Sequence, residues 1–589
     1  MKAIALAAAL ACPVPQLMAQ SFMLNPYGCP DAVSLNGKWN AIVDPYSSGE
    51  SMKYYLNRKP EKKSEFLEYS FDGGLQLNVP GDFNSQVPEL NYYEGNVWYQ
   101  RSFEAQKKEG RRQSLYFAGV SYETKVWLNG VEVGRHEGGF TPFQFDITDQ
   151  VKDGVNDLVV LVNNDRRPDG IPAMSFDWWN YGGIMRDVFF LDRPAVHIRD
   201  YKVQLTPDRK GIAGYVQLEG ADSPQEVTLA IEGLDVRHTL TTDDKGFGSF
   251  ELKAAPELWV PGNPKLYPVK ISTGQDRIDD EIGFRTVSVK ETEILLNGEP
   301  VFLKGVNFHE EVPQRLGRAY SEADAAMILG EVKALGCNFI RTSHYPQNEH
   351  IVRAAERMGL MIWEEIPIWQ GIDFTNAEVF KKAEMMLRDM IYRDKNRAAV
   401  IIWSVANETK PSEARDKMLV RLVDLCHELD GTRLVAAAFD NPRYDGATKT
   451  FRLEDKLAEA VDVVGVNKYL GWYTPFPLPP AEIKWDVAAG KPLIFSEFGA
   501  EALSGKRGPD DVAHEWSEDY QAAVYRQNLE MFRNIPNLRG TAPWVLFDFR
   551  SPYRRQQTYQ NGWNRKGLLG DKGQRKMAWQ VMKHFHDMK

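Results

Sequence analysis

Eight apolar, strand-like runs alternate with helical segments in the second half of the chain, and this alternation limits the possible fold more than any other feature. The runs cover residues 301–307, 337–344, 361–368, 399–408, 434–439, 462–469, 492–499 and 541–549. Helical periodicity separates them, as at 321–335, which opens on the capping-box pattern Ser321-Glu322-Ala323-Asp324. Eight strand–helix units over about 300 residues are typical of one closed parallel barrel. We therefore predict a C-terminal (β/α)8 TIM barrel over residues 289–589.

The first half of the chain is rich in short strands and lacks this alternation. Runs such as 114–120, 124–128 and 157–162 are β-branched or aromatic, and Asn129-Gly130 is a strong hairpin signal. This pattern predicts a jelly-roll β-sandwich over residues 21–195. Short strands continue through residues 196–288, a length that suits an immunoglobulin-like β-sandwich. A chain of 589 residues is expected to be multidomain, in agreement with three units.

The first twenty residues resemble an export signal. Met1-Lys2 gives a positive start, residues 3–11 are apolar, and small residues continue to Ala19. We expect cleavage near Ala19 or Gln20 and a periplasmic or secreted protein. Lipid anchoring at Cys12 is the less favoured alternative, because the residue three positions before it is the small Ala9. The apolar run is too short to span a bilayer, and no other stretch predicts a transmembrane segment.

Composition narrows the class of partner. The net charge of −10 argues against nucleic-acid binding, which favours a basic surface. The aromatic content of 12%, with 15 Trp, suits recognition of carbohydrate, although most tryptophans are expected in the core. The four cysteines have no metal-ligand spacing, and Cys337 and Cys426 lie in apolar segments that predict burial. We expect neither a metal nor a cofactor; homo-oligomerisation stays open.

Two glutamates end predicted barrel strands. Glu408 follows the run 400–407, and Glu497 ends the run 492–497. An unpaired buried carboxylate is costly, and the C-terminal ends of barrel strands are where active sites lie. The alternative is a helix N-terminal charge, which the repetition at two strand ends disfavours. One acid and one carboxylate facing each other are what hydrolysis of a glycosidic bond requires.

Other polar and aromatic residues follow strand ends at the same predicted face. We expect a substrate-binding role for His344 after the second strand, Asn407 beside the fourth, and Asn467, Tyr469 and Tyr473 after the sixth. A tyrosine hydroxyl that contacts the attacking carboxylate would orient it. The alternative for the tyrosines is a structural aromatic cluster. Trp544, in the eighth run, is assigned to the same pocket.

Four segments resemble the signatures of glycoside hydrolase family 2. They are Gly305-Val306-Asn307-Phe308-His309, Arg341-Thr342-Ser343-His344-Tyr345-Pro346, Trp403-Ser404-Val405-Ala406-Asn407-Glu408 and Phe495-Ser496-Glu497-Phe498-Gly499. The resemblance covers nearly the whole mature chain, because the order of the three domains is also that of the family. It implies a retaining mechanism with Glu408 as acid/base and Glu497 as nucleophile. It also implies that Asn407 binds the sugar 2-hydroxyl.

Two further segments favour the β-glucuronidases within that family. Asn564-Arg565-Lys566 resembles the Asn-x-Lys motif that binds the glucuronate carboxylate, and Asp177-Trp178-Trp179 resembles a loop that sends an Asp into the sugar site. The chain departs from some glucuronidases by having Gln560 where they have an Arg; Arg554 and Arg555 lie near it. The expected activity is therefore exo-acting removal of terminal β-D-glucuronic acid.

Two alternatives to this activity stay open. A β-galactosidase of the same family would use the same pair of glutamates with a neutral C6 pocket. A non-catalytic carbohydrate-binding protein would not need Glu408, Glu497, Asn407 and Tyr469 together. The run 367–373 leaves little room for an insertion after the third strand, which predicts an open aglycone side that accepts larger groups such as oligosaccharides.

Overall fold

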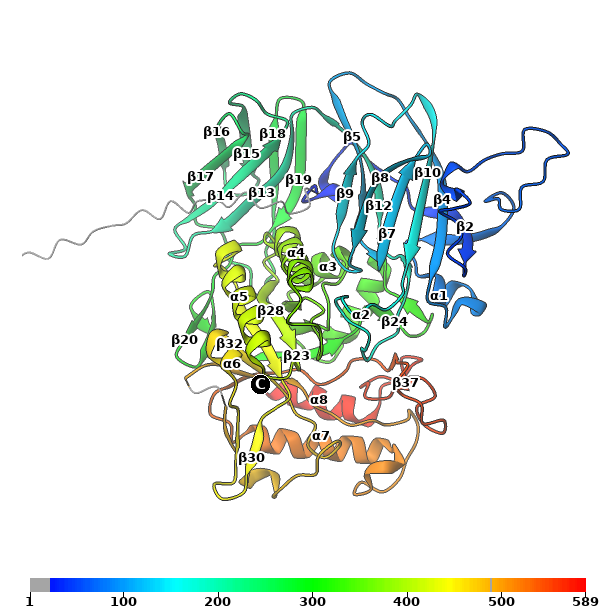
Figure 1. Ribbon diagram of the computed structural model, residues 1–589. Helices are drawn as coiled ribbons and strands as arrows, with labels where there is room; N and C mark the ends of the chain where they lie inside the picture. The colour runs from blue at the N-terminus through cyan, green and yellow to red at the C-terminus, as the bar shows by residue number, and fades with distance from the viewer. Residues whose placement is uncertain (1–21, 488–489) are drawn as a thin grey trace, which may run out of the picture.

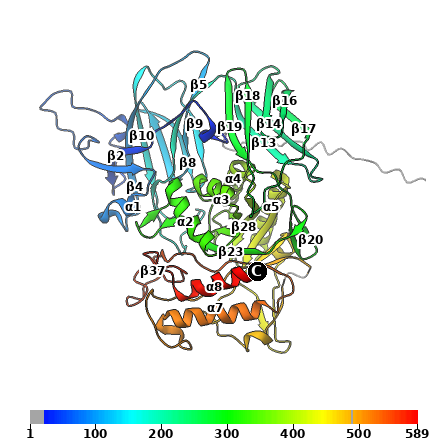
Figure 2. The same ribbon diagram turned by 180° about the vertical axis from the view of Figure 1, so that it is seen from behind.

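The computed structural model describes residues 22–487 and 490–589 (Figure 1). The predicted signal peptide, including Cys12 and the cleavage region, lies outside the described residues. Two β-sandwiches lie side by side on one side of a barrel, and helices α7 and α8 lie on the opposite side of the barrel from them (Figures 1 and 2). The three predicted domain types are therefore all present.

The N-terminal sandwich is built from two antiparallel sheets. The first has the order β1-β12-β5-β9 and the second β3-β2-β4-β10-β7-β8. Asn129 and Gly130 both have positive φ and form the predicted hairpin between β7 and β8. The bounds are β1 Ala32–Ser34, β2 Gly37–Asp44, β3 Leu75–Val79, β4 Asn96–Ala105, β5 Arg111–Phe117, β7 Glu123–Leu128, β8 Val131–Glu137, β9 Phe143–Asp146, β10 Gly154–Asn163 and β12 Val188–Pro194.

The second sandwich has a three-stranded sheet, β13-β14-β17, and a four-stranded sheet, β16-β15-β18-β19. Its apolar core continues into the first sandwich through Tyr116 and Leu191. The two sandwiches therefore share buried surface. The bounds are β13 His197–Leu205, β14 Gly211–Glu219, β15 Glu226–Ile231, β16 Val236–Thr241, β17 Phe247–Lys253, β18 Tyr267–Thr273 and β19 Asp276–Ile282.

Eight parallel strands close into the barrel in the order of the chain. The bounds are β23 Leu303–Phe308, β26 Phe339–Thr342, β27 Met361–Glu365, β28 Val400–Asn407, β29 Leu434–Phe439, β32 Val463–Asn467, β34 Leu493–Glu497 and β35 Leu538–Thr541. Our placement of the eighth strand at 541–549 is wrong, because Pro543 cannot donate to a ladder and the chain leaves the sheet after Thr541. The apolar residues after it cross the barrel mouth, where Trp544 N donates to Phe498 O.

Helices cover the outside of the barrel. They are α2 Glu322–Ala334, α3 Glu349–Met358, α4 Ala377–Asp394, α5 Glu413–Leu429, α6 Lys456–Ala460, α7 Glu518–Phe532 and α8 Met577–Met588. Ser321 and Asp324 form the predicted capping box of α2. In the described part of the crossover between β32 and β34, a 3-10 turn (Pro480–Glu482) and β33 (Lys484–Asp486) stand in place of an α-helix. Cys337 and Cys426 are buried, as predicted.

A buried ion pair joins the first sandwich to the barrel. Arg186 Nη2 lies 2.7 Å from Glu310 Oε2, and both side chains are almost fully buried. Arg186 also donates to the carbonyl oxygens of Phe140 and Pro346. This contact fixes the segment after β11 (Gly183–Ile184) against the barrel. Among the described helices, none combines the length and the apolar character needed to cross a bilayer.

Candidate active site

Glu408 occupies a left-handed backbone position directly after β28. Its φ is +53°, a strained value for a residue with a Cβ. Its carboxyl oxygens accept hydrogen bonds from Asn467 Nδ2 at 2.9 Å and Gln370 Nε2 at 3.2 Å. Burial raises the pKa of Glu408 to about 8, and the negative charges of Glu497 and Asp440 add to the rise. This glutamate is therefore protonated at neutral pH, as a general acid must be.

Glu497, the last residue of β34, has donors on both oxygens. Arg341 Nη1 lies 2.8 Å from Oε1, and the hydroxyl of Tyr469 lies 2.6 Å from Oε2. Burial, followed by the negative charges of Glu497 and Glu408, raises the pKa of Tyr469, so its hydroxyl stays a donor. A cation and a hydroxyl thus hold its two oxygens in place. The arrangement suits an attacking carboxylate.

Arg341 connects the two catalytic strands. Its second guanidinium nitrogen, Nη2, lies 3.0 Å from Glu365 Oε1 and 2.7 Å from Asn407 Oδ1. Glu365 Oε1 lies 2.8 Å from His344 Nδ1, so it fixes both side chains. The amide nitrogen of Asn407 is buried and no described residue accepts a hydrogen bond from it.

A cavity of about 370 Å³ opens above the two glutamates. It holds eight of the eleven predicted site residues, namely Asp177, His344, Glu408, Tyr469, Tyr473, Glu497, Trp544 and Lys566. Trp544 stacks on the His344 ring at 4.9 Å. Asn407, Asn467 and Asn564 do not line the cavity. Asn467 donates to Glu408 and Asn564 to Asp177, which do line it, and Asn407 accepts from Asn467 and Arg341. The other lining residues are Ser175, Trp369, Gln370, Tyr553 and Arg554.

A charged group lies at one end of the cavity around Lys566. Its Nζ contacts the Tyr473 hydroxyl at 2.7 Å and Glu501 Oε1 at 3.4 Å. Burial opposes the charge of Glu501, but the cations Lys566 and Arg554 outweigh it and lower the pKa of Glu501. Gln560, which stands where some glucuronidases have an Arg, donates to both Glu501 oxygens at 2.8 and 3.0 Å.

Asp177 reaches this end of the cavity from the first sandwich. It lies on the loop 164–182, and it accepts hydrogen bonds from Ser551 and Arg554. Asn564 Nδ2 lies 3.3 Å from Asp177, while Asn564 Oδ1 accepts from the backbone of Lys566. Asn564 therefore positions the residues on either side of it.

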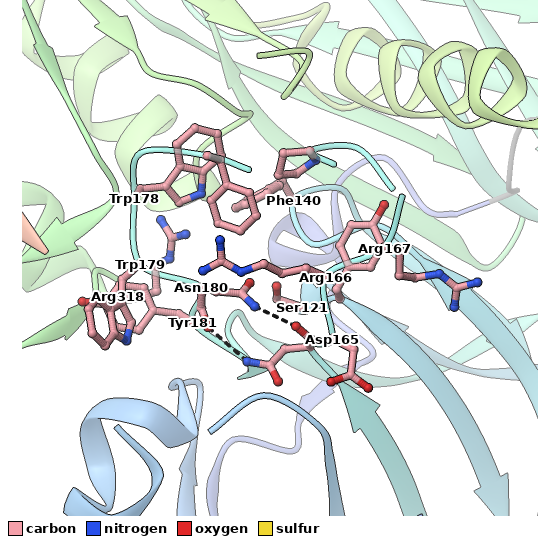
Figure 3. A pocket seen from close by; sticks show the side chains of 14 residues that line it. Ser121, Phe140, Asp165, Arg166, Arg167, Trp178, Trp179, Asn180, Tyr181 and Arg318 are labelled. Atoms are coloured by element: carbon pink, nitrogen blue, oxygen red, sulfur yellow. Dashed lines mark hydrogen bonds between the residues drawn. The ribbon is translucent and has the colours of Figure 1, made fainter. Parts of the chain in front are cut away.

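A second cavity is lined by residues of the loop 164–182 together with Ser121, Phe140 and Arg318 (Figure 3). Its volume is about 20 Å³, room for one water molecule and not for a sugar. Asn180 and Asn164 exchange hydrogen bonds at its wall, and Arg318 and Trp178 face it (Figure 3). This cavity is part of the support for the loop and not a substrate site.

Several site residues were absent from the predicted set. They are Glu365, Trp369, Gln370, Glu501 and Ser551. Glu365 ends β27, and the same strand-end signal could have found it. Glu501 and Gln370 lie in irregular segments, where the sequence gives no partner. Within the described chain, no group of three His, Cys, Asp or Glu side chains could hold a metal ion.

The short loop after the third strand agrees with the sequence prediction. Only residues 366–376 separate β27 from α4, and no long insertion covers Trp369 and Gln370. That loop therefore does not cover the side of the cavity where Glu408 and Glu497 lie.

Comparison with known proteins agrees with this architecture. Residues 33–194 match the sugar binding domain of glycosyl hydrolases family 2, and residues 287–588 match the TIM barrel domain of that family. Residues 196–285, between them, match a further model of glycosyl hydrolases family 2. A β-glucuronidase of Rattus norvegicus is 30% identical, and the match covers 92% of this chain and 89% of that protein.

Solved structures agree as well. A β-glucuronidase from an uncultured Clostridium sp. has a TM-score of 0.82 at 27% identity, covering 95% of this chain and 98% of that one. A β-glucuronidase of Ruminococcus gnavus in complex with D-glucuronic acid has a TM-score of 0.81 at 25% identity, and the match covers 94% of this chain and 97% of that one. The chain belongs to glycosyl hydrolases family 2.

Proposed function

We propose that the protein is an exported, retaining, exo-acting β-glucuronidase. The chemistry rests on the contrast between the two glutamates. Glu408 is protonated at neutral pH and is positioned to donate its proton to the glycosidic oxygen. Glu497, held by Arg341 and Tyr469, attacks the anomeric carbon and forms a glycosyl-enzyme ester as the aglycone leaves. Glu408, now a base, takes a proton from the water that hydrolyses the ester.

The choice of glucuronide rests on Lys566. It is a buried ammonium group that lines the same cavity as both glutamates. Besides its contact with Glu501, this cation can pair with a substrate carboxylate at C6, which a neutral hydroxymethyl group does not offer. The relatives named above carry the same activity, and one of them is described with D-glucuronic acid. Asp177 and Lys566 border one end of the cavity, which suits a terminal sugar and an exo mode of attack.

Two experiments test this activity. The first measures kcat/KM on four 4-nitrophenyl glycosides: the β-D-glucuronide, β-D-galacturonide, β-D-galactoside and β-D-glucoside. The panel compares acidic with neutral sugars, and sugars that differ in configuration at C4. We expect the glucuronide to be cleaved with the highest kcat/KM. Preference for the galactoside would refute the proposal. No turnover of any substrate would favour the alternative of a non-catalytic carbohydrate-binding protein. NMR of the first product should show the β anomer of glucuronic acid, and the α anomer would exclude retention.

Export rests on the sequence of residues 1–20. N-terminal sequencing of the protein from its natural source should begin near Ala19 or Gln20 if the segment is cleaved. A mature chain that begins with a lipid-modified Cys12 would support the anchored form instead.

A further inference from the structure

We infer that Gln370 is a positioning residue for Glu408, which holds the cavity-side oxygen of the carboxyl group and stabilises the negative charge that develops there as the proton leaves. This inference rests on the proposed function, in which Glu408 is the acid/base. Gln370 lies on the short segment between β27 and α4, and it lines the cavity together with Glu408. Its Nε2 donates a hydrogen bond of 3.2 Å to Glu408 Oε2.

Two side-chain amides hold the two oxygens of Glu408. Asn467 Nδ2 donates to Oε1 at 2.9 Å, whereas Gln370 donates to Oε2. Asn467 is buried and does not line the cavity, while Gln370 is exposed and does. Oε2 is therefore the oxygen on the cavity side, and it is the one from which a proton can reach a glycosidic oxygen.

Backbone contacts place Gln370 beside Glu408. The backbone nitrogen of Gln370 donates to Asn407 O at 2.8 Å, and Asn407 N donates to Ile368 O at 2.9 Å. These bonds, with the bridge between Trp369 and Asn407, continue the pairing of β27 with β28 beyond the end of β27. Gln370 and Glu408 both have left-handed backbone angles, with φ of +51° and +53°. Such strained positions persist where the surrounding contacts fix them, and they are common at functional sites.

The hydrogen bond from Gln370 changes strength during the reaction. A neutral carboxyl group can carry its proton on Oε2 and still accept a hydrogen bond there. When the proton moves to the leaving oxygen, Oε2 becomes charged and the same bond becomes a stronger, charge-assisted one. Gln370 therefore stabilises the transition state of the first step more than the ground state, and this lowers the barrier.

The groups around Glu408 act on its charge in two directions. Burial, followed by the negative charges of Glu497 at the end of β34 and Asp440 after β29, raises the pKa of Glu408. The hydrogen bonds from Asn467 and Gln370 lower this pKa. Tyr469, after β32, also interacts with Glu408, and its hydroxyl stays neutral because burial raises its pKa. Removing the donor at position 370 should therefore raise the pKa of Glu408 further.

Two variants test this role in opposite directions. Gln370→Met removes the donor and keeps the length of the side chain, and Gln370→Lys replaces the donor with a cation. Gln76→Met is the matched control, because the exposed Gln76 on β3 also donates a 3.2 Å hydrogen bond, to Asn40 Oδ1. We would measure the pH profile of kcat/KM on phenyl and 2,4-dinitrophenyl β-D-glucuronide, which differ in the protonation that the leaving group needs.

The alkaline limb should move up by roughly 0.3–1 pH unit in Gln370→Met, move down in Gln370→Lys and stay in place in Gln76→Met. Below the limb, Gln370→Met should lower kcat/KM by about two- to tenfold on the phenyl glucuronide and by less than about twofold on the dinitrophenyl glucuronide. A limb that does not move, or that moves the same way in both variants, would overturn the inference. So would an equal loss on the two substrates, which indicates a purely structural role.

A thermal melt separates this inference from the proposed function. The Tm of Glu408→Gln minus that of its parent, measured against pH, follows the protonation of Glu408 without any turnover. In the Gln370→Met background, the rise in this difference should move to higher pH. If the wild-type protein cleaves no glucuronide, the proposed function fails, while the melt still shows whether Gln370 acts on Glu408. If the protein cleaves glucuronides and neither the limb nor the melt moves, only the role of Gln370 fails.

Discussion

The hydroxyl of Tyr469 donates a 2.6 Å hydrogen bond to Glu497, the carboxylate that we propose attacks the anomeric carbon. Tyr469→Phe removes this donor and nothing else. A hydrogen bond to a charged group contributes about 1.5–3 kcal/mol, so kcat/KM should fall roughly 10- to 150-fold. Steady-state kinetics and a thermal melt check this. Tyr46→Phe, at a side chain that is 89% exposed, is the control, and a variant of Tyr469 with wild-type kinetics would contradict the assignment.

The raised pKa of Glu408 predicts the alkaline limb of activity. In the proposed mechanism the acid form of Glu408 carries out the first step. Since its pKa is about 8, kcat/KM should decline as pH rises through about 8. Glu408→Gln should lose this limb when a substrate with a good leaving group is used, because such a substrate needs no proton. A pH profile from 5 to about 10 tests both proteins. An identical limb in the variant would assign it to another group.

The raised pKa of Glu408 also predicts that the difference in stability between Glu408→Gln and wild type depends on pH. Because burial raises the pKa of Glu408 from 4.5 to about 8, the folded protein holds a proton that the unfolded chain loses at lower pH. That contribution is fully present below about 4.5 and is lost as pH rises through about 8. The Tm of Glu408→Gln minus that of wild type should therefore increase between pH 5 and 9. Asp373→Asn, at a carboxyl outside the core, should show no such rise.

Lys566→Ala tests the charge that selects the acidic sugar. Loss of a charge-assisted contact should cost about 2–4 kcal/mol, or roughly 30- to 1000-fold in kcat/KM on a glucuronide. Activity on a glucoside should fall far less.

The control for Lys566 must allow for its partner, since removing the lysine leaves Glu501 buried without its nearest cation. Lys566→Met combined with Glu501→Gln removes both charges and should melt closer to wild type than Lys566→Ala. If the double variant kept full glucuronide activity, Lys566 would not bind the carboxylate.

The ion pair of Arg186 and Glu310 should carry much of the contact between sandwich and barrel. Arg186→Met leaves Glu310 charged and buried, which should cost about 3–5 kcal/mol of unfolding free energy. Denaturant unfolding measures the loss. Arg135→Met, which breaks an exposed pair with Glu132, should cost about 0–1 kcal/mol. Equal losses would mean that the buried pair contributes no more than a surface pair.

The sequence predicted those parts of the fold that depend on local pattern. Seven of the eight barrel strands were located because each is an apolar run next to a helical period. The eighth was misplaced because Leu538–Thr541 contains Arg539 and Gly540, while the aromatic loop after it is buried across the barrel mouth and looks like a strand.

In the site, too, local pattern predicted some residues and missed those whose roles depend on contacts distant in sequence. Glu408, Glu497 and Tyr469 were found because they follow strand ends, and strand ends of one barrel meet. Glu501 and Gln370 were missed because their roles depend on contacts with residues distant in sequence, Lys566 for one and Glu408 for the other. No spacing rule connects them.

Asp177 enters the cavity from a domain that contributes neither catalytic glutamate. Part of the cavity wall is thus encoded separately from the two glutamates, although Lys566 belongs to the same domain as they do. Insertions or substitutions in the loop 164–182 can alter the accepted sugar while the barrel strands stay unchanged. Selection for activity on a different glycoside can therefore act through the N-terminal domain while Glu408 and Glu497 stay unchanged.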